Sequence, residues 1–138
     1  MVHAVIDASV IASWFLSDEG HGKYDDILNS IDKIKIHVPS IFEYEFMNIL
    51  LNAEKRRRVN YATVIEIVET IGRYPIEIGS LTVDLTEKMN VFKMARIYDL
   101  TIYGAAYLEL AVRLNAPLIT YDKLLSDSAR KLKVKTIL

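Results

Sequence analysis

The sequence predicts an α/β fold in which helices cover both faces of a parallel β-sheet. Two short runs, HAVI before Asp7 and PLITY before Asp122, are almost continuously apolar, as strands buried on both faces are. Segments with helical periodicity separate these runs, which is the order that a parallel sheet with crossover helices requires. Because 138 residues suffice for one domain with a real core, we expect residues 1–138 to form a single domain.

The first half of the chain is expected to hold two strands and four helices. The β-branched run after His3 predicts the first strand, and Pro39 stops the second because proline lacks a backbone N–H. The following long helix carries an apolar stripe formed by Phe42, Phe46, Ile49, Leu50 and Ala53. In order, we expect a strand at 3–7, helices at 8–16 and 20–29, a strand at 35–38, and helices at 40–58 and 60–71.

The second half repeats the alternation of strand and helix. Ile76–Ile78 is a short candidate strand, and helical spacing returns at 84–98 and at 102–114, where Asn115 ends the helix. The segment 116–122 is expected to be a buried strand. A short helix and the segment 134–138 close the chain.

Composition narrows the class of protein. The chain is 51% hydrophobic and 25% charged, which is ordinary for a compact soluble domain. Its apolar runs are far shorter than the ~20 residues of a membrane span, and its N-terminus lacks the basic region of a signal peptide. Zero cysteines exclude disulfides and thiolate chemistry, so we expect a cytoplasmic protein. The formal net charge of −1 gives no overall attraction to nucleic acid.

Two acids stand where strands end. Asp7 follows VI and Asp122 follows ITY. In an open parallel sheet, ligands bind beyond the carboxyl ends of the strands, so both carboxylates should point into one crevice. A strand-end aspartate can also cap the following helix. For one aspartate alone the two interpretations are balanced, whereas the pair favours a site.

A third acid is expected from the helix after Pro39. Glu43 and Glu45 are about 200° apart around a helix and cannot share one site. Asn48 and Asn52 continue a polar stripe on the side of Glu45, which favours Glu45 as the residue lining a polar cleft. The alternative is a surface glutamate beside solvated asparagines.

Converging carboxylates without histidine or cysteine make an oxygen-rich site that suits Mg²⁺ or Mn²⁺. Such ions serve hydrolytic phosphoryl chemistry by activating water. Ser9 and Thr120 lie two residues from Asp7 and Asp122 and could hold a carboxylate or a metal-bound water. A hydroxyl beside a strand end is also ordinary in a turn or cap.

Four segments together resemble the PIN-domain family, specifically VapC-like toxins. They are VIDASVIASWFLSDE, VPSIFEYEFMNIL, YDLTIYGAAYLELAVRL and LITYD, in the family's order over nearly the whole chain. The resemblance implies a PIN-like domain with Mg²⁺-dependent ribonuclease activity on RNA. It also implies a VapB-like antitoxin as partner and a homodimer.

The family pattern assigns site residues position by position. It places Asp7 and Glu45 as metal-binding acids, Asn48 three residues after the glutamate, and Asp122 as the acid of a T-x-D motif. The remaining acid of the family lies in a Y-D-A-x-Y stretch. This chain has YGAAY there, so Gly104 occupies the position of the expected aspartate.

No neighbour is expected to replace the missing acid. Asp99 precedes the expected N-cap Thr101, and Glu109 lies about 140° from Gly104 around the helix. Losing one carboxylate should lower metal affinity and lower the rate by orders of magnitude. Two origins of Gly104 stay open: an inactivating change in an active enzyme, or a natural protein that persists as a binding module.

Two functions of different classes therefore compete. The first is a toxin-type, metal-dependent endoribonuclease impaired by Gly104, and the second is a non-catalytic PIN-like module that binds an antitoxin partner or RNA. The basic cluster, formed by Lys55, Arg56, Arg57 and Arg58, could contact RNA phosphates. It could equally complement the helix dipole and stay solvated. His3 and His37 show no metal-ligand spacing and are expected to be incidental.

Overall fold

The computed structural model describes residues 2–16, 25–79 and 85–136. Within these residues the strands form one sheet in the order β3-β2-β1-β4, and every neighbouring pair is parallel. The strands are β1 (Val2–Ile6), β2 (Ile34–Val38), β3 (Ile76–Ile78) and β4 (Leu118–Ile119). The parallel sheet that the apolar runs predict is confirmed.

β1 occupies the centre of the sheet. Its register pairs Val2 with Ile34 on one side and Val5 with Leu118 on the other. Ala4, Val5 and Ile6 are all buried, as a strand covered on both faces requires.

The predicted strand at 116–122 is shorter than expected and spans only Leu118–Ile119. Pro117 has no N–H to donate, although its carbonyl accepts a 2.9 Å hydrogen bond from the N–H of Val5. The N–H of Asp7 reaches the carbonyl of Ile119 at 3.0 Å. This pairing brings Asp7 beside the end of β4.

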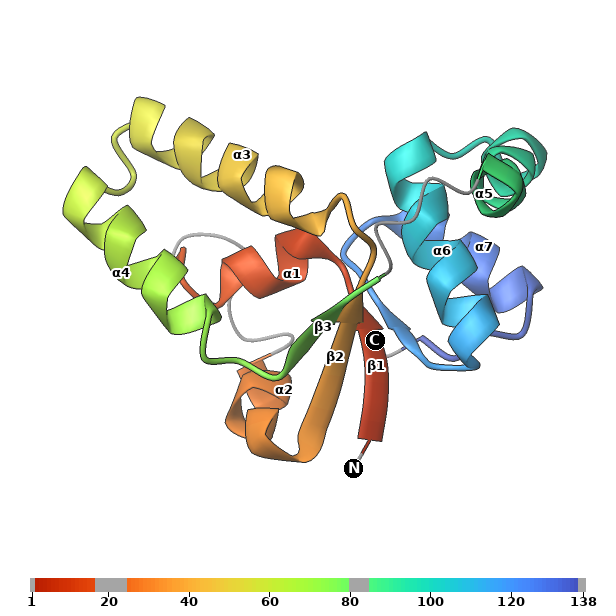
Figure 1. Cartoon of the computed structure of the whole chain (residues 1–138), viewed down its shortest axis with the longest axis horizontal. Helices are drawn as coiled ribbons and strands as arrows, with labels where there is room; N and C mark the ends of the chain where they lie inside the picture. The colour runs from red at the N-terminus through yellow and green to blue at the C-terminus, as the bar shows by residue number, and fades with distance from the viewer. Residues whose placement is uncertain (1, 17–24, 80–84, 137–138) are drawn as a thin grey trace.

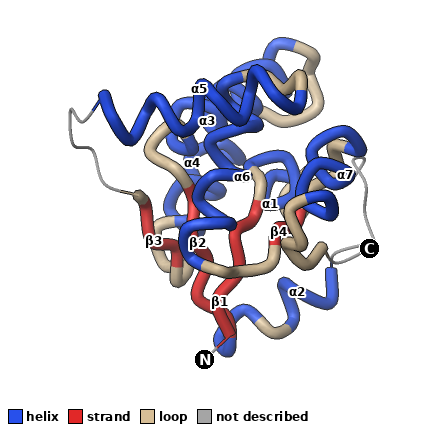
Figure 2. Tube along the Cα trace, turned by 90° about the vertical axis from the view of Figure 1, so that its right-hand side faces the viewer, coloured by secondary structure: helices blue, strands red, loops and turns tan. Residues whose placement is uncertain are grey.

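Helices cover both faces of the sheet. They are α1 (Ala8–Ser13), α2 (Asp25–Asn29), α3 (Phe42–Lys55), α4 (Tyr61–Ile71), α5 (Leu85–Tyr98), α6 (Ile102–Leu114) and α7 (Lys123–Lys131), with a 3₁₀ turn at Ile31–Lys33. In Figure 1, α1, α3 and α4 lie on one side and α5, α6 and α7 on the other. Figure 2 views the sheet from the side of α6, which contacts β1, β2 and β4.

Several helix boundaries differ from the sequence-based expectation. The helix expected at 8–16 ends at Ser13, and that expected at 40–58 ends at Lys55, before Arg57 takes a positive φ of 60°. For the helix expected at 20–29, only Asp25–Asn29 falls within the described residues. Residue 84 of the expected helix 84–98 and residues 137–138 of the closing segment also lie outside them.

Two helices have the N-cap residues that the sequence predicts. Asn60 precedes α4, and its Oδ1 accepts a 2.9 Å hydrogen bond from the N–H of Thr63. Thr101 is the N-cap of α6, and Asn115 ends that helix in the left-handed conformation. No helix in the described parts of the chain is both long enough and apolar enough to cross a membrane.

Candidate active site

Asp7 lies between β1 and α1, and its carboxylate accepts a hydrogen bond from Thr120. The hydroxyl of Thr120 donates a 2.8 Å hydrogen bond to Asp7 Oδ2, and Asp7 makes no side-chain cap hydrogen bond to α1. Asp7 is nevertheless the N-cap residue of α1 by position. The N–H groups of Ser9 and Ala8 still lie near enough to favour its charged form.

Burial raises the pKa of the Asp7 carboxyl above its ordinary value. The negative charge of Asp122 adds to this rise, and the hydrogen bond from Thr120 opposes it. A buried carboxylate close to another negative charge gains stability from a nearby cation. The electrostatics at Asp7 therefore favour cation binding.

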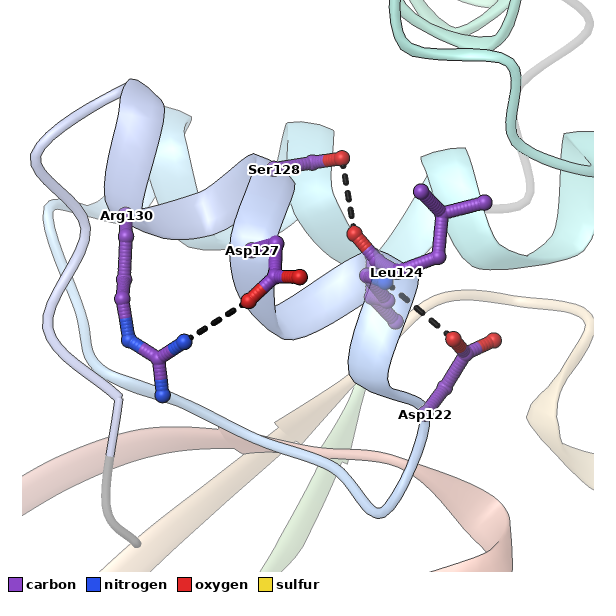
Figure 3. Close-up of polar contacts among 6 residues, drawn as sticks. Asp122, Leu124, Asp127, Ser128 and Arg130 are labelled. Carbon is purple, nitrogen blue, oxygen red and sulfur yellow. Dashed lines mark hydrogen bonds and ion pairs between the residues drawn. The ribbon is translucent and has the colours of Figure 1, made fainter.

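Asp122 serves as a helix cap and also acts on the site. It is the N-cap of α7, where its Oδ1 accepts a 3.2 Å hydrogen bond from the N–H of Leu125 (Figure 3). Its own N–H donates to Thr120 Oγ1 at 3.0 Å. Thr120 therefore connects the two strand-end aspartates, one through its hydroxyl hydrogen and the other through its hydroxyl oxygen. Asp122 is exposed, whereas Thr120 is buried.

Glu45 reaches the same site from α3. It is half-buried, and its Oε1 accepts a 2.9 Å hydrogen bond from the hydroxyl of Tyr107 on α6. Burial raises the pKa of Glu45, and the negative charge of Asp7 raises it further, while the Tyr107 hydrogen bond lowers it. Glu43 is exposed. The polar stripe thus selected the glutamate that lies near Asp7.

Tyr107 was not among the sequence-based candidates. Its side chain is 1% exposed, and burial raises the pKa of its hydroxyl, as do the charges of Glu45 and Asp7. The hydroxyl therefore stays protonated and donates to Glu45. Its signal in the sequence was the second tyrosine of YGAAY, three residues after Gly104 and thus on the same helix face.

Gly104 lies in the first turn of α6, one turn before Tyr107. Its N–H donates a 3.0 Å hydrogen bond to the N-cap oxygen of Thr101. A Cβ added at Gly104 would meet Thr101 Oγ1 at 3.4 Å, an ordinary contact, and Gly104 is not a residue with positive φ. Neither packing around a Cβ nor the backbone conformation therefore demands glycine at position 104.

The neighbouring acids are engaged or placed elsewhere, as expected. Glu109 is buried, and its Oε1 accepts a 2.8 Å hydrogen bond from Arg113 Nε. It lines a separate cavity with Pro39 and Lys88. Asp99 is exposed and precedes the N-cap of α6.

The remaining candidate residues differ in exposure and in their position relative to Glu45. Asn48 is exposed and lines a cleft with Glu45, and Ser9 is half-buried in α1. The basic cluster begins at Lys55, ten residues after Glu45 and so about 15 Å further along α3. The cluster does not line the cleft that contains Glu45, and its contact with RNA stays a prediction.

The donor set matches Mg²⁺ or Mn²⁺ in type, because the candidate ligands are all carboxylate oxygens. Within the described residues, however, no group of three or more histidine, aspartate or glutamate side chains is close enough together to hold a metal ion. The charge of Asp122 acts on Asp7, and the charge of Asp7 acts on Glu45, but the three carboxylates do not form a closed ligand set. The family pattern predicts a further carboxylate at position 104, where this chain has glycine.

His3 and His37 lie in contact, although their spacing in the sequence did not predict it. His3 Nδ1 lies 2.7 Å from His37 Nε2, with ring centroids 5.0 Å apart. Burial and the positive charge of His3 lower the pKa of His37. Strand pairing brings the two together, because β1 and β2 are neighbours although 34 residues separate the histidines.

The fold is an α/β domain with helices on both faces of a parallel sheet. Its acids lie beyond the carboxyl ends of the strands, which is the edge where domains of this class bind ligands. A family model of the PIN domain matches residues 4–131. The chain therefore belongs to the PIN-domain family, which confirms the resemblance carried by the four segments.

Solved structures agree with this assignment at the level of the fold. PAE2754 from Pyrobaculum aerophilum has a TM-score of 0.72 and 19% identity, over 99% of this chain and 90% of that one. VapBC2 from Rickettsia felis, solved bound to a DNA fragment from its promoter, has a TM-score of 0.62 and 13% identity, over 99% and 97%. A comparison with curated protein sequences gives no match.

Proposed function

We propose that the chain is a metal-dependent endoribonuclease of the VapC toxin type whose activity is impaired by Gly104. PIN domains are generally nucleases, and the VapBC2 complex of Rickettsia felis shares the fold. The observation that carries the proposal is the placement of three acids at one edge of the sheet, where the charge of Asp122 raises the pKa of Asp7 and the charge of Asp7 raises the pKa of Glu45.

The proposed ligands of Mg²⁺ or Mn²⁺ are Asp7, Glu45 and Asp122, whose side chains would move closer together to hold the ion. When bound, the ion supplies a water of lowered pKa and balances negative charge on the phosphate being cleaved. The protein's own part is to fix the carboxylates. Thr120 orients Asp7 through a 2.8 Å hydrogen bond, and Tyr107 orients Glu45 through one of 2.9 Å. Ligand-orienting partners of this kind typically change metal affinity about 10- to 100-fold.

Gly104 explains why the activity should be weak. It lies one turn before the tyrosine that binds Glu45, on the face of α6 that meets the site. An aspartate at this position would add an oxygen donor and negative charge. Without it, a metal ion is held less tightly and the attacking water is positioned less well.

The proposed partners are RNA as substrate, a VapB-like antitoxin and a second copy of the chain. The fold shared with VapBC2 supports the antitoxin. Leu85, Met89 and Phe92 are exposed apolar side chains within about 60° of one another around α5, and they offer a surface for self-association.

A second candidate function is a non-catalytic module that binds an antitoxin or RNA. Gly104 itself favours this alternative, because a binding module does not need the complete acid set. One comparison separates the two functions: cleavage of RNA by the chain and by Gly104→Asp, each with Mg²⁺ or Mn²⁺ and with EDTA. The nuclease proposal requires metal-dependent cleavage by Gly104→Asp. Partner binding without cleavage by either protein would establish the binding module instead.

A further inference from the structure

Two exposed tyrosines border the candidate site and are not used by the chemistry described so far. Tyr44 on α3 is 79% exposed, and Tyr103 on α6 is 55% exposed. Each immediately precedes a site position, Glu45 in one helix and Gly104 in the other. Figure 1 shows the N-terminal parts of α3 and α6 on either side of the sheet edge. The helices that carry the two tyrosines therefore begin on opposite sides of this edge.

Both tyrosines line one cleft. It has a volume of about 370 Å³, and its other lining residues are Ile41, Glu45, Asn48 and Ile49. The volume lies within the range of sites that bind small organic groups. Because Glu45 is part of the lining, the cleft opens directly beside the proposed catalytic carboxylates.

The chemistry of the cleft suits a nucleic-acid base better than a phosphate. Among the described residues, no lysine or arginine lines it, and the basic cluster begins about 15 Å further along α3 than Glu45. Aromatic rings stack on the faces of unpaired bases, and an asparagine amide can both donate to and accept from a base edge. Tyr44, Tyr103 and Asn48 provide these two kinds of contact.

We infer that Tyr44 and Tyr103 form a subsite that binds a base of single-stranded RNA by stacking, next to the phosphate to be cleaved. This inference rests on the proposed function and makes its substrate more specific. Stacking accepts any base and requires that the base be unpaired. The chain should therefore select single-stranded RNA over duplex RNA.

The test measures RNA binding and not cleavage, so it does not depend on Gly104. The probe is a short, fluorophore-labelled single-stranded RNA, and the comparison probe has the same backbone with abasic riboses. Dissociation constants are measured by fluorescence anisotropy for the full chain, Tyr44→Ala, Tyr103→Ala and the matching phenylalanine variants. Ile65→Ala is the control, because Ile65 on α4 is 42% exposed and does not line this cleft.

Each alanine variant should raise the Kd for the normal RNA about 5- to 100-fold, the range expected for loss of one stacking ring. The phenylalanine variants and Ile65→Ala should keep the affinity of the parent. All variants should bind the abasic RNA equally weakly. Because both tyrosines are exposed, the alanine variants should fold, which circular dichroism can verify.

Three results would overturn the subsite. The alanine variants could keep the Kd of the parent, the phenylalanine variants could lose as much RNA affinity as the alanine variants, or the parent could fail to bind RNA. Dissociation of a dimer with unchanged RNA affinity would assign the tyrosines to a subunit contact instead. If Gly104→Asp cleaves RNA and the tyrosine substitutions leave its KM unaltered, the nuclease proposal stands and the subsite is wrong. If the tyrosine variants lose RNA binding but Gly104→Asp does not cleave RNA, the subsite stands and the nuclease proposal is wrong.

Discussion

Tyr107 on α6 donates a 2.9 Å hydrogen bond to Glu45 on α3 and so joins two helices that lie on opposite sides of the sheet. The bond places a neutral donor against a half-buried carboxylate whose pKa is already raised by burial. A buried charge needs such a partner, since leaving it without one costs more than the hydrogen bond itself contributes. The Tyr107 hydroxyl is therefore part of both the stability and the geometry of the site.

Tyr107→Phe removes only this hydroxyl. We expect the free energy of unfolding at neutral pH to fall by about 1–3 kcal/mol, because Glu45 loses a donor to its charged form. Urea denaturation measures this change. Tyr103→Phe, which alters an exposed hydroxyl in the same helix, should leave the unfolding free energy unchanged. Equal stabilities of the two variants would show that the Tyr107–Glu45 bond contributes nothing.

Thr120→Val removes the hydroxyl that connects Asp7 with Asp122 while keeping the shape of the side chain. Asp7 loses its 2.8 Å donor, and the N–H of Asp122 loses its acceptor. We expect Mn²⁺ to bind about 10- to 100-fold more weakly, as when other ligand-orienting residues are lost. Isothermal titration calorimetry measures this affinity. Thr70→Val, which removes only a hydrogen bond to the carbonyl of Glu66, is the control and should bind Mn²⁺ like the parent.

Gly104→Ala separates the effect of the backbone from that of the missing carboxylate. An added Cβ contacts only Thr101 Oγ1, at 3.4 Å, and alanine loses less conformational entropy than glycine on folding. The free energy of unfolding should therefore rise by about 0.5–1 kcal/mol. Thermal unfolding monitored by circular dichroism tests this rise. A lower melting temperature would mean that position 104 does not tolerate a side chain.

His37 should make the stability depend on pH. Burial and the charge of His3 lower its pKa below the ordinary 6.5, so the unfolded chain binds the proton more readily than the folded one. Its stabilising contribution is present above pH 6.5 and is lost as the pH falls through the lowered pKa. Melting temperatures measured across this window should fall more steeply with acid for the parent than for His37→Gln. Parallel curves would contradict the assigned direction.

The strand-end acids could be predicted because parallel strands place their carboxyl ends along one edge. Asp7 and Asp122 needed only the two apolar runs that precede them. Glu45 was separable from Glu43 because a helix puts residues two apart on different sides, and the polar stripe indicated which side met the site. These inferences used local periodicity alone.

The remaining features depend on contacts between distant segments. The partner of Glu45 is 62 residues away, and only the packing of α6 near α3 selects Tyr107. His3 and His37 meet because β1 and β2 are neighbours in the sheet. Likewise, Tyr44 and Tyr103 share a cleft because two helices begin near the same sheet edge. Periodicity carries no information about such pairings.

The most direct test measures RNA cleavage under single-turnover conditions by the chain, Gly104→Ala and Gly104→Asp. With Mg²⁺ or Mn²⁺, Gly104→Asp should cut at least about 100-fold faster than Gly104→Ala, and EDTA should abolish the difference. The alanine variant shows that any gain comes from the carboxylate and not from a stiffer helix. If Gly104→Asp cuts no faster than Gly104→Ala, or if cleavage persists in EDTA, the converging acids are not a metal-dependent nuclease site limited by Gly104.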